Sequence, residues 1–108
     1  MAGNGNSREA IYTKLNAETN VKSVADDGYI DLKSGMAGWG FVMAGDNEEY
    51  GAFCFTSAGV VTVLSDASTN FVGTDTDAKL CVFDNGSNVR IRNRLGSAKT
   101  IRYEVKYS

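Results

Sequence analysis

The chain has 108 residues, a formal net charge of −2 and a hydrophobic content of 43%. This length predicts one domain with its own core, and the apolar content is too high for a disordered chain. The absence of histidine excludes the common zinc sites and every His-based triad, and no apolar run approaches the ~20 residues of a membrane span.

The first 27 residues are predicted to form an N-terminal arm. The start, MAGNGN, lacks the apolar segment of a signal peptide, which favours synthesis in the cytoplasm. Residues 7–19 allow either a short helix or an ordered arm, because Ile11 and Leu15 alone cannot stabilise a helix of this length. The same two residues can pack around a symmetry axis, so we expect them at a subunit interface.

From residue 28 onward, short apolar runs alternate with turns rich in Gly, Asn, Asp and Ser. This pattern predicts an all-β fold, an antiparallel β-sandwich or jelly roll over residues 28–108. The chain has no proline to protect strand edges, which suggests that other chains cover them. The predicted strands are Tyr29–Leu32, Gly38–Ala44, Tyr50–Thr56, Val60–Leu64, Phe71–Val72, Leu80–Phe83, Asn88–Arg94 and Thr100–Tyr107.

The segment GMAGWGF carries the only tryptophan. In a strand, Trp39 and Phe41 share one face, while the small Gly38 and Gly40 share the other and let a neighbouring backbone approach. Large aromatic residues dominate cores, which favours a core position for Trp39. The alternative is a sugar platform made by Trp39 or Tyr50, and these two residues are the candidate glycan contacts.

The remaining reactive side chains form no recognisable catalytic motif. Cys54 and Cys81 lie in strand-like segments without a CxxC spacing, and the simplest interpretation is two buried free thiols. The acidic pairs Asp75/Asp77 and Glu48/Glu49 are expected to be solvated, with a glycosidase or esterase built on loop acids as the alternative. We therefore expect no enzyme activity, no metal and no cofactor.

In the C-terminal segment NVRIRNRLGSAKTIRYEVKYS, apolar residues alternate with charged residues on both sides of a break at Gly96–Ala98. This pattern predicts two strands joined by Gly96–Ala98 as a hairpin, with Arg92 opposite Arg102. One face should be cationic. The residues expected to point inward are Val89, Ile91, Ile101, Tyr103 and Val105.

Charge is segregated along the chain. Residues 34–84 hold seven acids and one base, whereas residues 85–108 hold six bases and one acid. These regions can complement each other across subunits, which predicts a homo-oligomer, most simply a trimer; the competing view is a monomer that pairs them internally. The sequence pI of about 5.0 argues against a nucleic-acid binder. The expected interface cations are Arg90, Arg92, Arg102 and Lys106.

The stretch from GWGFVMAGDNEEYGAFCFTSAG to LCVFDNGSNVRIRNRLGSAKTIRYEVKYS resembles the small β-sandwich modules of tailed-phage structural proteins. The shared sequence features are turns rich in Gly, Asn, Thr and Asp, short proline-free strands, and a basic C-terminal strand pair that ends in aromatic residues. The resemblance implies a non-enzymatic tail or head accessory protein, made in the host cytoplasm and assembled into the virion. Its partners would be further copies, other virion proteins and a host-surface glycan. The alternative is a carbohydrate-binding module of a cellular or secreted protein.

Overall fold

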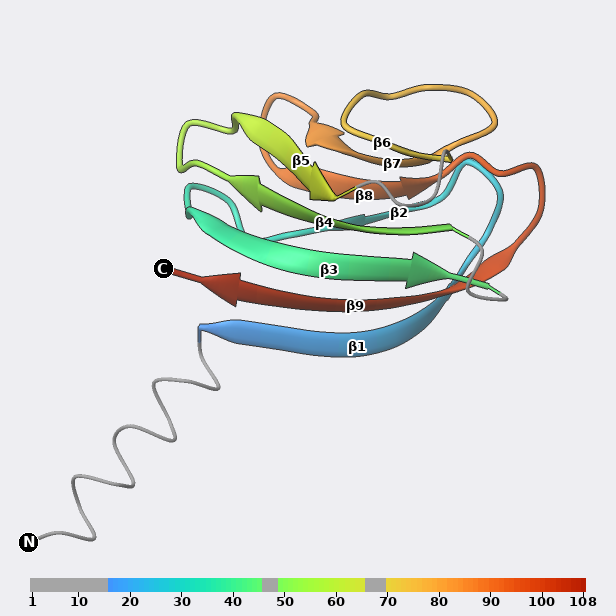
Figure 1. Cartoon of the computed structure of the whole chain (residues 1–108), viewed down its shortest axis with the longest axis horizontal. Helices are drawn as coiled ribbons and strands as arrows, with labels where there is room; N and C mark the ends of the chain where they lie inside the picture. Colours follow the sequence, from blue (N-terminus) through green and yellow to red (C-terminus); the bar gives the residue numbers. More distant parts are fainter. Residues whose placement is uncertain (1–15, 46–48, 66–69) are drawn as a thin grey trace, which may run out of the picture.

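The chain folds as a β-sandwich in a computed structural model that describes residues 16–45, 49–65 and 70–108. Figure 1 shows the two layers of strands and the connections that cross between them. No helix in these three ranges is long and apolar enough to span a bilayer. The described residues form nine strands: β1 (Ala17–Val24), β2 (Tyr29–Asp31), β3 (Gly38–Ala44), β4 (Glu49–Phe55), β5 (Val61–Ser65), β6 (Phe71–Val72), β7 (Leu80–Asp84), β8 (Val89–Asn93) and β9 (Lys99–Tyr107).

The strands form two sheets that share one core. The five-stranded sheet has the order β1-β9-β3-β4-β5 and the four-stranded sheet the order β2-β8-β7-β6. All neighbouring strands are antiparallel except β6 and β7, which pair in parallel. The predicted all-β sandwich is confirmed, and two predicted strands, Gly38–Ala44 and Phe71–Val72, have the observed bounds.

The N-terminal strand β1 lies where the sequence suggested an arm or a helix. Residue 16 is a turn and residues 17–19 are strand, so the helix alternative is wrong for them; residues 7–15 lie outside the described residues. β1 pairs with β9 along its whole length, from Ala17 opposite Lys106 to Val24 opposite Lys99. The five-stranded sheet therefore begins at Ala17, ahead of the expected boundary at residue 28.

The predicted C-terminal hairpin is also wrong. β8 pairs with β2 and β7 in one sheet, while β9 pairs with β1 and β3 in the other. The segment between them crosses from sheet to sheet and is held by the buried Asn93, whose Nδ2 donates to the Ser97 carbonyl at 2.9 Å and to the Val24 carbonyl at 3.0 Å. Arg92 and Arg102 consequently lie on different sheets rather than opposite each other.

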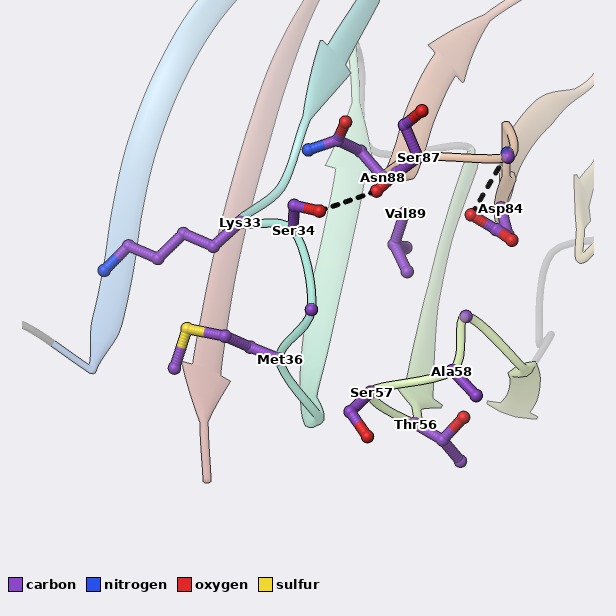
Figure 2. A pocket seen from close by; sticks show the side chains of 13 residues that line it. Lys33, Ser34, Met36, Thr56, Ser57, Ala58, Asp84, Ser87, Asn88 and Val89 are labelled. Carbon is purple, nitrogen blue, oxygen red and sulfur yellow. Dashed lines mark hydrogen bonds between the residues drawn. The ribbon is translucent and has the colours of Figure 1, made fainter.

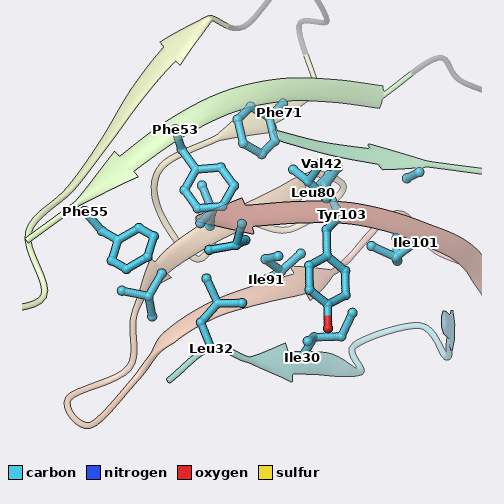
Figure 3. Close-up of a cluster of buried hydrophobic side chains, with 14 of the residues drawn as sticks. Ile30, Leu32, Val42, Phe53, Phe55, Phe71, Leu80, Ile91, Ile101 and Tyr103 are labelled. Carbon is cyan, nitrogen blue, oxygen red and sulfur yellow. The ribbon is translucent and has the colours of Figure 1, made fainter. Parts of the chain in front are cut away.

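The core lies between the two sheets, as Figure 3 shows. All five C-terminal residues predicted to point inward are buried. The inward glycines of β3 create room for the rings of β4: a Cβ added at Gly40 would lie 2.7 Å from the Glu104 carbonyl oxygen and 3.0 Å from Cζ of Phe53. The close approach expected at these glycines is thus present, and it fixes which side chains of β3 must face outward.

Candidate functional site

The outer face of the four-stranded sheet is covered by ion pairs within the chain. Arg90 on β8 donates from Nε and Nη2 to the two carboxylate oxygens of Asp31, at 2.8 and 3.2 Å. Its guanidinium also lies 3.5 Å from the ring centroid of Tyr29, a cation–π contact. The hydrogen bond to Asp31 raises the pKa of Arg90 above its usual value, so this side chain is a permanent cation with a partner in its own chain.

The next two arginines of this face share acids from the loop before β7. Arg92 donates to Asp75 at 2.9 Å, and Arg94 donates to the same carboxylate at 3.4 Å and to Asp27 at 3.3 Å. Arg94 also lies 3.8 Å from Asp77.

Asp75 and Asp77, one of the two acidic pairs considered for hydrolysis, are therefore engaged in this charge network. Glu49 of the other pair is buried rather than solvated as expected, and Glu48 lies outside the described residues. Two of the expected interface cations, Arg90 and Arg92, are paired internally.

The outer face of the five-stranded sheet is different, because it exposes large apolar side chains. Trp39 is 57% exposed and Phe41 is 41% exposed, both on β3. Val21 on β1 and Leu64 on β5 are 54% and 60% exposed. The core position expected for Trp39 is wrong, because Gly38 and Gly40 occupy the inward positions of β3 against the rings of β4.

Register places charged residues directly beside this apolar row. On β9, Lys106 lies opposite Trp39, Glu104 opposite Phe41, and Arg102 opposite Met43. On the other side, β4 brings Tyr50 opposite Met43, and the Tyr50 ring lies 6.4 Å from that of Phe41. We call these outward residues of β3, β4 and β9 the outer patch: Trp39, Phe41, Met43, Tyr50, Cys54, Arg102, Glu104 and Lys106.

The charges of the outer patch have no ion-pair partner among the residues that the structure describes. None of Arg102, Glu104 and Lys106 takes part in a salt bridge there, whereas Arg90, Arg92 and Arg94 all do. A shallow depression of about 200 Å³ lies beside Phe41, between Val21 and Met43, with Arg102 and Glu104 on its wall. Apolar side chains framed by unpaired charges are typical of a protein-binding surface.

A second hollow lies at one end of the sandwich, between the loops that join β2 to β3, β4 to β5 and β7 to β8 (Figure 2). It measures about 170 Å³ and is lined mainly by small polar side chains. Ser34 donates to the Ser87 carbonyl at 2.8 Å, and Asp84 accepts from the Gly86 N–H at 3.2 Å. These two hydrogen bonds hold the loops at this end of the sandwich.

One edge of the core is closed by two tyrosines that share an acid. Tyr107 and Tyr103 on β9 both donate to Glu18 on β1, Tyr103 at 3.4 Å. Burial, followed by the hydrogen bond to Glu18, raises the pKa of Tyr107 far above its usual value; burial also raises that of Tyr103. These contacts attach β1 to the sheet and are structural rather than catalytic in geometry.

The two cysteines are free thiols on different sheets. Cys81 is buried, as expected, and burial raises the pKa of its thiol. Cys54 is only half-buried and lies on the outer patch opposite Trp39. Across the described ranges, no group of three His, Cys, Asp or Glu side chains is arranged to hold a metal ion.

The structure brings together four of the residues singled out from the sequence and separates the others. Trp39, Tyr50, Arg102 and Lys106 share the outer patch, while Arg90 and Arg92 lie on the opposite face of the sandwich. Ile11 and Leu15 fall outside the described residues. Sequence reasoning did not select Phe41 and Glu104 as site residues, although it placed each of them on the strand face of a predicted site residue.

Three comparisons with known proteins found no similar protein. No family model matches it, and neither a curated protein nor a solved structure is detectably similar.

Proposed function

We propose that this protein is a non-enzymatic structural module that works by protein–protein assembly through the outer patch. The observation that carries the proposal is the exposure of Trp39 and Phe41 beside Arg102, Glu104 and Lys106, which have no ion-pair partner in the described part of the chain. Exposed aromatic residues dominate binding energy at interfaces, and adjacent charges select the partner.

The setting that we propose is the virion of a tailed phage, after synthesis in the host cytoplasm. This part rests on the resemblance of residues 28–108 to phage β-sandwich modules, which fits an accessory role in the tail or head. The partners would be copies of the chain and neighbouring virion proteins. Neither nucleic acid nor a membrane is part of the proposal, because Arg90, Arg92 and Arg94 are engaged with Asp31, Asp75 and Asp27.

Particle incorporation tests this function. Purified phage particles carrying the wild-type gene should retain the chain through density-gradient centrifugation, as detected by immunoblot. The variant Phe41→Ser, with its fold checked by circular dichroism, should be lost from the particles. The matched control, Thr62→Ala on the same sheet, should be retained. Absence of the wild-type chain from purified particles would refute the virion role.

A second candidate is carbohydrate binding, favoured by the exposure of Trp39 together with Tyr50 on one sheet face. Sugars stack on aromatic rings and need hydrogen-bond partners, which here would be Lys106 beside Trp39 and Glu104 beside Phe41. Protein assembly stays the first candidate because Val21, Phe41 and Met43 extend the apolar area around the depression, and a protein partner can bury that area. A glycan array separates the two: a hit whose binding shifts the Trp39 fluorescence and disappears in Trp39→Ala would favour the carbohydrate function.

A further inference from the structure

The outer patch has a charge pattern that is complementary to itself. Along β9, the outward side chains run Arg102, Glu104 and Lys106, which alternate in sign. The apolar row of β3 runs beside them, with Met43 level with Arg102 and Phe41 level with Glu104. A surface of this kind can bind a copy of itself, because a two-fold rotation between the levels of Arg102 and Glu104 sets each of these two charges opposite the other.

We propose that the occupant of the outer patch is a second copy of this chain, packed sheet to sheet about a two-fold axis. The axis runs across the strands between the levels of Arg102 and Glu104. Arg102 of each copy then lies opposite Glu104 of the other, and Phe41 of each lies over Met43 of the other. The inference rests on the proposed assembly function and names its first partner.

The two-fold pair differs from the trimer expected from the sequence. That expectation relied on acids from the middle of the chain meeting C-terminal cations across subunits. In the structure, Asp75 already binds Arg92 and Arg94 of its own chain. Arg102 and Lys106 of β9, two of the cations expected at the interface, have no ion-pair partner in the described residues, and together with Glu104 they favour an isologous contact, in which the same patch serves both copies.

The size of the face sets the expected affinity. Five strands spaced about 4.8 Å apart and about seven residues long cover a footprint of roughly 19 by 24 Å. Two such faces bury on the order of 1,000 Å², at the lower limit for a specific interface. We therefore expect association in the micromolar range, with monomer below it, rather than an obligate dimer.

Sedimentation equilibrium of the full chain between about 1 and 500 µM tests the pairing. The wild-type protein should pass from monomer to dimer. Arg102→Glu and Glu104→Arg should each weaken association at least tenfold, because each places like charges opposite each other twice. The double variant Arg102→Glu with Glu104→Arg should restore it. Arg90→Glu, on the opposite face, should leave the dimer constant within about twofold.

Three results would overturn the inference. One is a monomer at every concentration, whether the patch binds a different protein, a glycan or a segment of its own chain. Another is a dimer that is indifferent to both single reversals, and the third is a trimer. The proposed function stands separately: a monomer that is retained in particles refutes the pair alone, whereas a dimer absent from particles refutes the virion role alone.

Discussion

The two outer faces of this sandwich handle charge in opposite ways. On the four-stranded sheet, Arg90, Arg92 and Arg94 each contact an acid from β2 or from a loop, so these cations are paired within the chain. On the five-stranded sheet, alternating charges of β9 stand without such partners in the described ranges, beside exposed Trp39 and Phe41. The comparison teaches that position along the chain did not identify which cations are paired within the fold. The contacts between residues far apart in the sequence did.

The difference arises from how each face is covered. The loop before β7 folds back over β8, where Asp75 meets two arginines and Thr76 contacts the thiol of Cys81. No described loop lies in the same way over β3 and β9, whose outward residues remain exposed. A covered face contributes to folding, whereas an open apolar face is available for binding.

The largest expected effect concerns the two sides of β3. Gly40→Val should destabilise the protein by about 2–3 kcal/mol, because its side chain would be forced against the Glu104 carbonyl and the side chains of Val105 and Phe53. Trp39→Ser, one residue away on the outer patch, should cost less than about 1 kcal/mol in the monomer. Urea unfolding of both variants measures this. A loss of about 3–5 kcal/mol for Trp39→Ser would place the indole in the core and remove the patch.

The tyrosine edge of the five-stranded sheet predicts a loss of stability at alkaline pH. The pKa values of Tyr103 and Tyr107 are raised in the folded state, so the unfolded chain ionises first, near pH 10. The stability they contribute is complete below pH 10 and decreases as pH rises above it, by about 1 kcal/mol at pH 11. Urea unfolding at pH 8, 9, 10 and 11 measures this decrease.

Tyr107→Phe is the matched control for the alkaline transition, because it removes the ionisable hydroxyl and keeps the ring that packs against Phe55. Its stability should depend less on pH above 10 than that of the wild type. An equal pH dependence in the two proteins would contradict the assignment to Tyr107.

Asp75, which is ion-paired, and Glu104, which has no ion-pair partner in the described residues, should contribute differently to the free energy of unfolding. Asp75→Asn removes the carboxylate shared by Arg92 and Arg94 and should cost about 0.5–1 kcal/mol, reduced by salt because the pairs are partly exposed. Glu104→Gln on the outer patch should change monomer stability by less than about 0.5 kcal/mol. Thermal unfolding at low protein concentration compares them. A larger effect of Glu104→Gln would reverse the contrast between the faces.

Thiol labelling is expected to show the smallest effect, but it reports directly on the outer patch. Cys54 lies on the outer patch and should react with a thiol reagent at low protein concentration, then more slowly as the protein associates. Cys81 should stay unreactive throughout, because burial both shields its thiol and raises its pKa. A Cys54 rate that is independent of protein concentration would mean that association leaves this face uncovered.

The sequence predicted much of the sandwich because period-two alternation marks strands that bury one face. The bounds of β3 and the inward residues of β8 and β9 followed from it. Alternation cannot choose the neighbour of a strand, and so the hairpin of β8 with β9 was wrong. The strand β1 was not predicted because its sequence, AETNVKSV, belongs to an edge strand with exposed polar residues and shows no alternation of apolar and polar residues.

The candidate site was only partly predictable for a related reason. The period-two alternation of a strand placed Trp39 and Phe41 on the same face of β3, but it could not say which face of β3 points toward the core. That depends on Phe53 and Phe55 of β4, which occupy the space left by the glycines. The pairing of Asp31 with Arg90 spans 59 positions in the chain, and no local pattern predicts such a contact.

The most direct test of the open face as a self-pairing surface is to mix two variants. Arg102→Glu makes the pair positions acidic in one chain, and Glu104→Arg makes them basic in the other. Each variant alone should remain largely monomeric, while an equimolar mixture should form a heterodimer, resolved from both homodimers by native mass spectrometry. A mixture that contains only the two monomers, at concentrations where the wild type pairs, would contradict the account.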